Sequence, residues 1–219
     1  MLRTHRTARA LSLLVVGGLL LAGCSGDEDG GDRGGEDRAG EQSTPTGVPE
    51  RWYDAVAEAV QDEPDVGTTA LLDARAECPL VDEVTIAGTA VEQSAAGVVR
   101  LGNRIPTAVC QFYPPVPVDL LVSQADDDAD YAELKVATGA QEQVGNEQTE
   151  QEVEIGDLTV LVVRVEYPTN PAAGVDYRAH FFDDEALGRV TLEVSDADER
   201  DADYDEQAAA EDLVALLGD

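Results

Sequence analysis

Few side chains of this 219-residue chain could carry out chemistry: it holds three cysteines and two histidines. The nucleophile, phosphate-binding, zinc-binding and redox patterns G-x-S-x-G, G-x-x-x-x-G-K-[ST], H-E-x-x-H and C-x-x-C do not occur. His5 lies in a short arginine-bearing segment at the N-terminus, so a hydrolase would have to use His180 as its base. We therefore expect no enzymatic activity and no cofactor.

His180 lies in a segment whose alternation predicts a strand, and its neighbours on that strand face are polar. The residues expected on this face and on the adjoining strands are Arg164, Glu166, Asp176, Arg178, His180, Arg189 and Glu193. One hypothesis is a polar binding face, formed by Arg164, Arg178, His180 and Arg189, that attracts an anionic ligand. The other is a solvated sheet face whose charges form cross-strand ion pairs.

Two clusters of acids, at residues 126–130 and 196–206, raise the question of a calcium site. An EF-hand loop needs glycine at its sixth position and glutamate at its twelfth. A loop that starts at Asp196 has Asp201 and Gln207 there, and one that starts at Asp201 has Glu206 and Asp212. Both fail the pattern, so we expect solvated acidic segments and no metal.

Cys24 follows Leu21-Ala22-Gly23, which has the form of a bacterial lipobox. In a lipobox the cysteine sulfur takes a diacylglycerol as a thioether, and the small residues before it let the signal peptidase reach the bond. The alternatives are a general signal peptide that happens to contain a cysteine, or a buried core cysteine. We expect Cys24 to be lipidated and to hold the protein on the outer face of the cell membrane.

The residues on both sides of Cys24 are typical of an exported protein. Residues 1–10 carry three arginines and no acid, and residues 11–22 are apolar except Ser12. This apolar stretch is shorter than the roughly 20 residues of a membrane-spanning helix. Residues 25–48 are rich in glycine and acids, which predicts a disordered tether. We expect a signal peptide at 1–23, the lipidated cysteine and tether at 24–48, and one extracytoplasmic domain at 49–219.

Cys78 and Cys110 remain once Cys24 is assigned to the lipid. Because exported proteins fold where disulfides form, we expect these two cysteines to be bridged. Two free buried thiols and a metal pair are the alternatives, although a metal site would want more cysteine or histidine ligands.

The charge of the chain excludes one class of partner. It has 46 acidic residues against 14 lysines and arginines, a formal net charge of −32. Loss of residues 1–23, which hold three arginines and no acid, makes it −35. A nucleic-acid interface needs a basic patch, so we expect no nucleic-acid partner. The hydrophobic content of 43% nevertheless predicts a packed core.

Apolar residues recur at helical spacing from Trp52 to Val60, which predicts a first helix that Pro64 ends. We expect further helices at 79–91, 129–137 and 205–217. For the last helix, Asp203 and Glu206 form the expected capping box, and Gly218 lies beyond its end.

Alternating apolar residues predict strands at 109–113, 116–122, 158–167, 175–181 and 190–194. Short connections join the last three, so these should form an antiparallel meander. Residues 92–106 are expected to form a loop, and 139–156 an exposed loop that can include an edge strand. The predicted fold is therefore an α+β domain: a mostly antiparallel sheet with helices packed on one face and one disulfide.

The order of these parts resembles an actinobacterial lipoprotein family known as domain of unknown function 3558. The likeness rests on the lipobox, the tether, C-P-L-V-D-E-V at 78–84, V-C-Q-F at 109–112, the meander and the last helix. It covers about residues 70–217, and the chain is also similar to the extracytoplasmic sensor domains of some mycobacterial kinases. The resemblance implies an envelope location and a disulfide-bonded α+β domain, and it brings no catalytic residue.

Taken together, these patterns favour a non-enzymatic, lipid-anchored envelope protein that binds a protein or ligand outside the membrane. The alternative is a lipid or glycolipid carrier, which would need an apolar cavity between the sheet and its helices.

Overall fold

The computed structural model describes residues 47–62, 71–74, 76–101, 104–114, 116–136, 146–170, 174–196 and 203–218. The predicted signal peptide, Cys24, nearly all of the tether and Pro64 lie outside these residues, as do residues 139–145 of the predicted loop.

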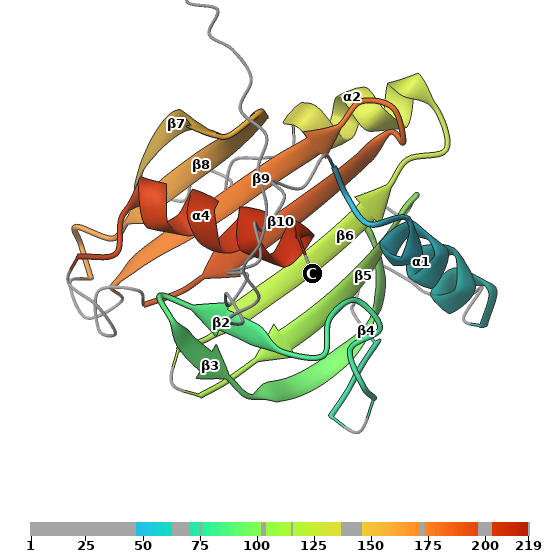
Figure 1. Ribbon diagram of the computed structural model, residues 1–219, viewed down its shortest axis with the longest axis horizontal. Helices are drawn as coiled ribbons and strands as arrows, with labels where there is room; N and C mark the ends of the chain where they lie inside the picture. The colour runs from blue at the N-terminus through green and yellow to red at the C-terminus, as the bar shows by residue number, and fades with distance from the viewer. Residues whose placement is uncertain are drawn as a thin grey trace, which may run out of the picture. The chain divides into compact units, whose positions relative to one another are not determined.

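One antiparallel sheet of eight strands organises the domain, in the order β1-β4-β5-β6-β10-β9-β8-β7 (Figure 1). The strands are β1 (Leu71–Asp73), β4 (Gln93–Leu101), β5 (Ile105–Phe112), β6 (Val118–Gln124), β7 (Glu147–Ile155), β8 (Leu158–Glu166), β9 (Val175–Asp183) and β10 (Gly188–Val194). The predicted meander of three strands is confirmed as β8-β9-β10, and β7 extends it to the edge of the sheet. A second run, β4-β5-β6, meets it where β10 pairs with β6.

Two helices cover one face of this sheet, which we call the front face. Helix α1 (Glu50–Asp62) lies against β4, β5 and β6, and helix α4 (Glu206–Leu217) lies against β7 to β10 (Figure 1). The predicted fold class, an α+β domain with a mostly antiparallel sheet, is therefore confirmed. The shorter helix α2 (Asp128–Val136) packs instead beside side chains of the opposite, back face, a distinction that the sequence did not reveal.

Large apolar side chains fill the layer between the front face and these two helices. The most deeply buried of them include Trp52, Val56, Phe112, Leu120, Leu192 and Leu213. Trp52 and Val56 belong to the apolar stripe that predicted α1, so that periodicity correctly identified the buried side of the helix. The front layer is a packed core.

The N-cap of α4 differs from the prediction by two residues. Asp205, and not Asp203, is the N-cap: its backbone is extended, and its carboxylate accepts a hydrogen bond from the Ala208 amide at 2.9 Å. Gly218 caps the other end, as predicted, and donates from its amide to the Ala215 carbonyl. An acid-rich run offers several capping residues, and the chain uses the one next to the first helical residue.

The helix predicted over 79–91 is wrong. This segment forms a hairpin of β2 (Val84–Ile86) and β3 (Thr89–Val91), joined by Ala87 and Gly88, both at positive φ. Val84 and Ile86 are buried and the residue between them is exposed, which is strand alternation. β-Branched side chains and a turn with glycine at positive φ outweighed the weak helical pattern.

The loop predicted over 92–106 is also wrong, because most of this segment is β4, which pairs with β5 along its length. Its residues 94–97 are Ser-Ala-Ala-Gly, whose small side chains give no alternating hydrophobic signal. Pairing to β5 supplies the strand conformation that the local sequence does not favour.

The predicted disulfide is confirmed. Cys78 and Cys110 are bonded, with their Cα atoms 5.5 Å apart, and both are buried. The bridge ties the segment before β2 to the middle of the sheet. Gln93 secures the same segment, because it accepts from the Cys78 amide at 2.9 Å and donates to the Ala76 carbonyl at 2.6 Å.

Gly188, at the start of β10, provides a test of how α1 seats on the sheet. A Cβ at this position would overlap the ring and hydroxyl of Tyr53, whose hydroxyl donates to Asp183 at 3.2 Å. We expect Gly188→Ala to lower the free energy of unfolding by about 1–3 kcal/mol, as overpacking does. Gly47→Ala, where a Cβ meets no atom within 4 Å, is the control, and urea unfolding measures both. Equal stability of the two variants would contradict this packing.

Candidate functional site

A cluster of buried polar side chains lies in the middle of the sheet. Among the described residues, the fully buried polar or charged side chains are Thr107, Ser123, His180, Arg189 and Thr191, with exposures of 0, 1, 2, 5 and 2%. We call these five residues the polar cluster. Burying polar groups in a sheet is unfavourable unless they are hydrogen-bonded, so a gathering of all five in one place calls for an explanation.

The register of four strands brings the polar cluster together. Ser123 of β6 is opposite Thr107 of β5 on one side and Arg189 of β10 on the other. Thr191 follows two residues after Arg189 and is opposite His180 of β9. Because cross-strand partners and alternate residues share a face, all five side chains project from the back face.

Two hydrogen bonds link members of the polar cluster in pairs. The hydroxyls of Thr107 and Ser123 are 2.9 Å apart, and Nδ1 of His180 is 2.9 Å from Oγ1 of Thr191. Each bond joins directly opposed residues of neighbouring strands, so the strand pairing itself sets the geometry. The result is a preorganised group of hydroxyls and an imidazole in a protected environment.

Arg189 connects the polar cluster to helix α2. Its Nη1 donates to the Leu134 carbonyl at 3.0 Å. Leu134 lies in the last turn of α2, where backbone carbonyls have no partner within the helix, so a guanidinium suits this position. Burial lowers the pKa of Arg189, although the nearby Glu193 acts in the opposite direction. Arg189 therefore fastens α2 to the sheet with a desolvated charge.

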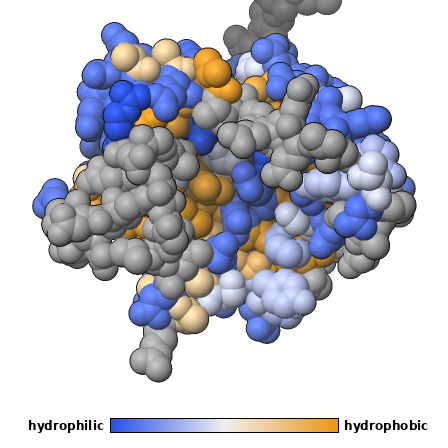
Figure 2. Space-filling model, turned by 180° about the vertical axis from the view of Figure 1, so that it is seen from behind, coloured by the Kyte–Doolittle hydropathy of each residue, from blue (hydrophilic) through white to orange (hydrophobic). Residues whose placement is uncertain are grey.

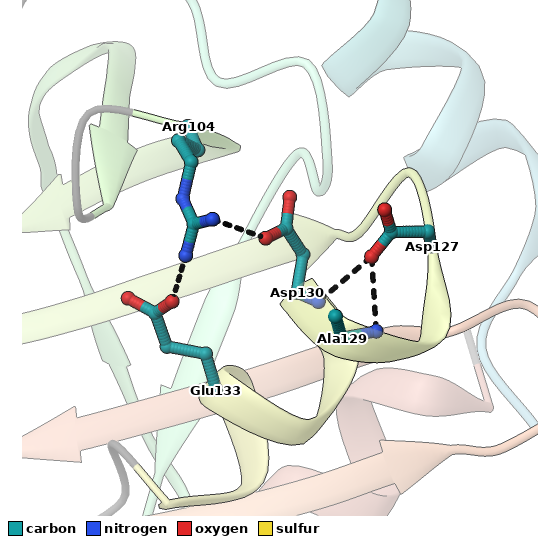
Figure 3. A network of polar contacts seen from close by, with 5 residues as sticks. All are labelled: Arg104, Asp127, Ala129, Asp130 and Glu133. Carbon is teal, nitrogen blue, oxygen red and sulfur yellow. Dashed lines mark hydrogen bonds and ion pairs between the residues drawn. The ribbon is translucent and has the colours of Figure 1, made fainter.

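The first turns of α2 are held mainly by interactions at the surface (Figure 3). Asp127 caps the helix, since its carboxylate accepts from the amides of Ala129 and Asp130, each at 2.9 Å. Arg104, which precedes β5, pairs with Asp130 at 3.1 Å and also with Glu133. Because the Arg104 side chain is 57% exposed, these ion pairs contribute little to stability.

The rest of α2 is held by the turn between β9 and β10 and by a small apolar cluster. Tyr131 donates to Asp184 at 2.9 Å, and Lys135 pairs with the same carboxylate at 2.5 Å. These two bonds lower the pKa of Asp184. The apolar cluster is separate from the front core and consists of Ile105, Ala125, Tyr131 and Leu134. A helix with so small a core is the weakly held part of the back face.

Charged residues adjoin the polar cluster farther along the back face. Glu193 of β10 is opposite Asp119 of β6 and Arg178 of β9, and it pairs with Arg178 at 3.5 Å. Burial raises the pKa of both carboxyls. Viewed from this side, hydrophobic and hydrophilic residues lie next to one another at the surface (Figure 2). Carboxyls with a shifted pKa, such as those of Asp119 and Glu193, are enriched at functional sites.

The structure unites three of the four residues predicted for the polar binding face. His180 and Arg189 belong to the polar cluster, and Arg178 lies on the same back face, paired with Glu193. Burial of His180 and Arg189 does not fit a solvated sheet face, although the cross-strand ion pair of Arg178 does.

The placement of Arg164 with these residues is wrong. Arg164 is opposite Tyr177 on the front face, and its Nε donates to the Tyr177 hydroxyl at 3.2 Å. It lines a surface depression of about 530 Å³ at the start of α4, beside several carboxylates. Strand β8 carries valines on both faces, so alternation alone could not show which side held the core.

Thr107, Ser123 and Thr191 were not among the site residues predicted from the sequence. The signal for Thr191 was present, since it lies between Arg189 and Glu193 on the polar side of an alternating strand. Thr107 and Ser123 become meaningful only through the pairing of β5, β6 and β10, which is a long-range feature.

Two further features of the described residues concern metal binding and membrane insertion. No group of three histidine, cysteine or acidic residues in that part of the chain could hold a metal ion. Within the same ranges, no helix is both long and apolar enough to cross a membrane.

In comparisons with known proteins, no family model, curated protein or solved structure matches the chain. The resemblance to domain of unknown function 3558 stays a prediction.

Asp119 makes the stability of the back face depend on pH. Its folded-state pKa is raised by burial, with a hydrogen bond from Gln111 acting against the shift. Folding therefore favours its protonated form, so the stabilisation is greatest below the unfolded-state pKa and is lost as pH rises through the folded-state pKa. We expect Asp119→Asn to be more stable than the wild type at pH 7, with a difference that shrinks towards pH 4.

Thermal unfolding from pH 4 to pH 8 measures this difference. Glu154→Gln, which removes an exposed carboxylate from β7, is the control. A destabilised Asp119→Asn variant at pH 7, or a difference that does not change with pH, would show that burial of Asp119 is not the cause.

Proposed function

We propose that this protein is a lipid-anchored cell-envelope protein, held outside the membrane by diacylglycerol on Cys24, and that it acts as a non-enzymatic binding or accessory module. The observation that carries the proposal is the pairing of its cysteines. Cys78 and Cys110 are bonded to each other inside the domain, which leaves Cys24 as the single cysteine of the chain outside that bridge. A structural disulfide suits an oxidising, extracytoplasmic compartment, and the remaining cysteine stands in the lipobox.

The non-enzymatic part of the proposal draws on His180. The only histidine that follows Cys24 is 2% exposed, and its Nδ1 is hydrogen-bonded to Thr191. A general base has to reach a proton of its substrate, and this imidazole is buried on the back face and bonded within the polar cluster. Its place among hydroxyls and Arg189 suits binding better than proton transfer.

The alternative of a lipid or glycolipid carrier receives no support from the described residues. Such a carrier needs an apolar space between the sheet and its helices, and the front layer is filled by side chains such as Trp52, Phe112 and Leu213. We therefore prefer a binding role that uses the back face.

Replacement of the lipobox cysteine tests the anchor. We expect Cys24→Ser, expressed with its whole N-terminal segment in a bacterial host, to leave the membrane fraction and to lose the mass of the lipid. Labelling with radioactive palmitate and mass spectrometry of the purified protein measure the change. A variant that stays in the membrane fraction with unchanged mass would contradict the proposal.

The double variant Cys78→Ser/Cys110→Ser is the matched control. It removes the same chemical group from the domain, so it should keep its lipid and its membrane location. Loss of a bridge between cysteines 32 residues apart should lower its free energy of unfolding by about 3–4 kcal/mol. Loss of membrane location in this control would mean that fractionation reports folding and not lipidation.

A further inference from the structure

The geometry points to the polar cluster as a binding site for a small oxyanion, a carboxylate or phosphate group, that α2 covers. This assignment rests on the proposed function, since it names the ligand chemistry of the binding module. Three observations support the assignment: the donor groups of the polar cluster, the hydrogen bond from Arg189 to the Leu134 carbonyl, and the weak attachment of α2.

The groups in the polar cluster are those that bind oxyanions. Arg189 carries five N–H donors and a permanent positive charge. In the Thr107–Ser123 pair one hydroxyl donates to the other, so one proton of the pair is left for a ligand, and Thr191 can donate when it accepts from Nδ1–H of His180. None of the five side chains is a carboxylate, in a chain with 46 acidic residues. The nearest acid on β10 is Glu193, four residues from Arg189; it pairs with Arg178, and its charge also acts on Arg189.

The environment makes these donors effective. A guanidinium that is 5% exposed has lost most of its water, and the lowered pKa of Arg189 reflects that desolvation. An anion that replaces the missing water would interact with it more strongly than in solution. The two hydrogen-bonded pairs, Thr107 with Ser123 and His180 with Thr191, hold the neighbouring groups in place beforehand.

The carbonyl of Leu134 occupies the place that an oxyanion would take. It accepts from Nη1 of Arg189 at 3.0 Å, so the end of α2 acts as a neutral substitute for a charged ligand. A carboxylate or phosphate oxygen is a better acceptor for a guanidinium than a backbone carbonyl. Binding of the anion and docking of α2 at Arg189 are therefore competing events.

Helix α2 can move away because, beside the Arg189–Leu134 bond that an anion would replace, few contacts hold it. Its two buried apolar side chains, Tyr131 and Leu134, belong to a small cluster with Ile105, Ala125, Phe182 and Leu187. Its ion pairs to Arg104 and Asp184 involve exposed side chains. The apparent affinity for an anion is then the intrinsic affinity reduced by the small fraction of molecules in which α2 has lifted.

The acidic surface sets the character of the site. A chain with a formal charge of −32 does not attract anions from a distance, so the affinity has to come from the desolvated donors. Five acids lie on α2 or next to it: Asp127, Asp128, Asp130, Glu133 and Asp184. This arrangement favours a small anion at high concentration over a large polyanion.

The test is titration of the whole protein with inorganic phosphate and, separately, with acetate, followed by calorimetry and by the shift of the melting temperature. We expect saturable binding of at least one of the two anions by the wild type, and the stronger of them identifies the group. Arg189→Met should weaken that binding by about tenfold or more.

Two isosteric variants keep the test valid if Arg189→Met fails to fold. Ser123→Ala and Thr191→Val remove one hydroxyl each with little change in volume, and each should weaken binding by about two- to tenfold. Arg51→Ala, which removes an exposed arginine from α1 on the other side of the sheet, should bind as the wild type does.

Arg104→Ala tests the role of α2. Loss of its ion pairs to Asp130 and Glu133 should populate the lifted helix and tighten binding by up to about fivefold. If neither anion shifts the melting temperature of the wild type, the site is overturned. It is also overturned if Thr191→Val and Ser123→Ala keep the full shift of the wild type. Weaker binding by Arg104→Ala would overturn the covering role of α2. Each of these failures leaves the lipid anchor, tested through Cys24, intact.

Discussion

The pairing of β10 with β6 is the contact on which the rest of the domain depends. It joins β4-β5-β6 to β7-β8-β9-β10 through seven consecutive residue pairs, from Gly188 opposite Gln124 to Val194 opposite Val118. The two strands are far apart in the chain, so this pairing closes a long loop at a considerable entropic cost. A shift of one residue would turn every side chain of β10 to the other face.

That single register determines both faces at once. On the front face it aligns Leu120 with Leu192 under the two covering helices. On the back face it places Ser123 beside Arg189 and Asp119 beside Glu193. The apolar front supplies most of the stability, because burial of apolar surface is the dominant favourable contribution. Burial of polar and charged groups on the back face lowers that stability, as is common at functional surfaces.

Strong local patterns allowed much of this fold to be predicted. The stripe from Trp52, the alternation of β8 to β10 and the two cysteines gave the correct class and the correct disulfide. The segments that were predicted wrongly lack such patterns: residues 94–97 are all small, and the β2–β3 hairpin has three-residue strands.

The candidate site was predicted in part, and for a physical reason. His180, Arg178 and Arg189 stand out because cations are rare in this chain, whereas threonine and serine do not. Arg164 was misplaced because both faces of β8 are apolar, so which face met the helices depended on contacts with α4 that no local pattern encodes. The role of α2 was not predicted at all, since it arises from a hydrogen bond between Arg189 and Leu134, 55 residues apart.

Native-state hydrogen exchange of the whole domain tests most directly whether α2 is a cover that opens over the polar cluster. The account predicts that the amides of Glu133, Leu134 and Lys135 exchange through a local opening, with a lower free energy and a weaker dependence on denaturant than the amides of Leu120 and Leu192. The contrary result is exchange of α2 and of the β6–β10 pair with the same free energy, only on global unfolding. That result would make α2 a fixed part of the core and the polar cluster a closed structural network.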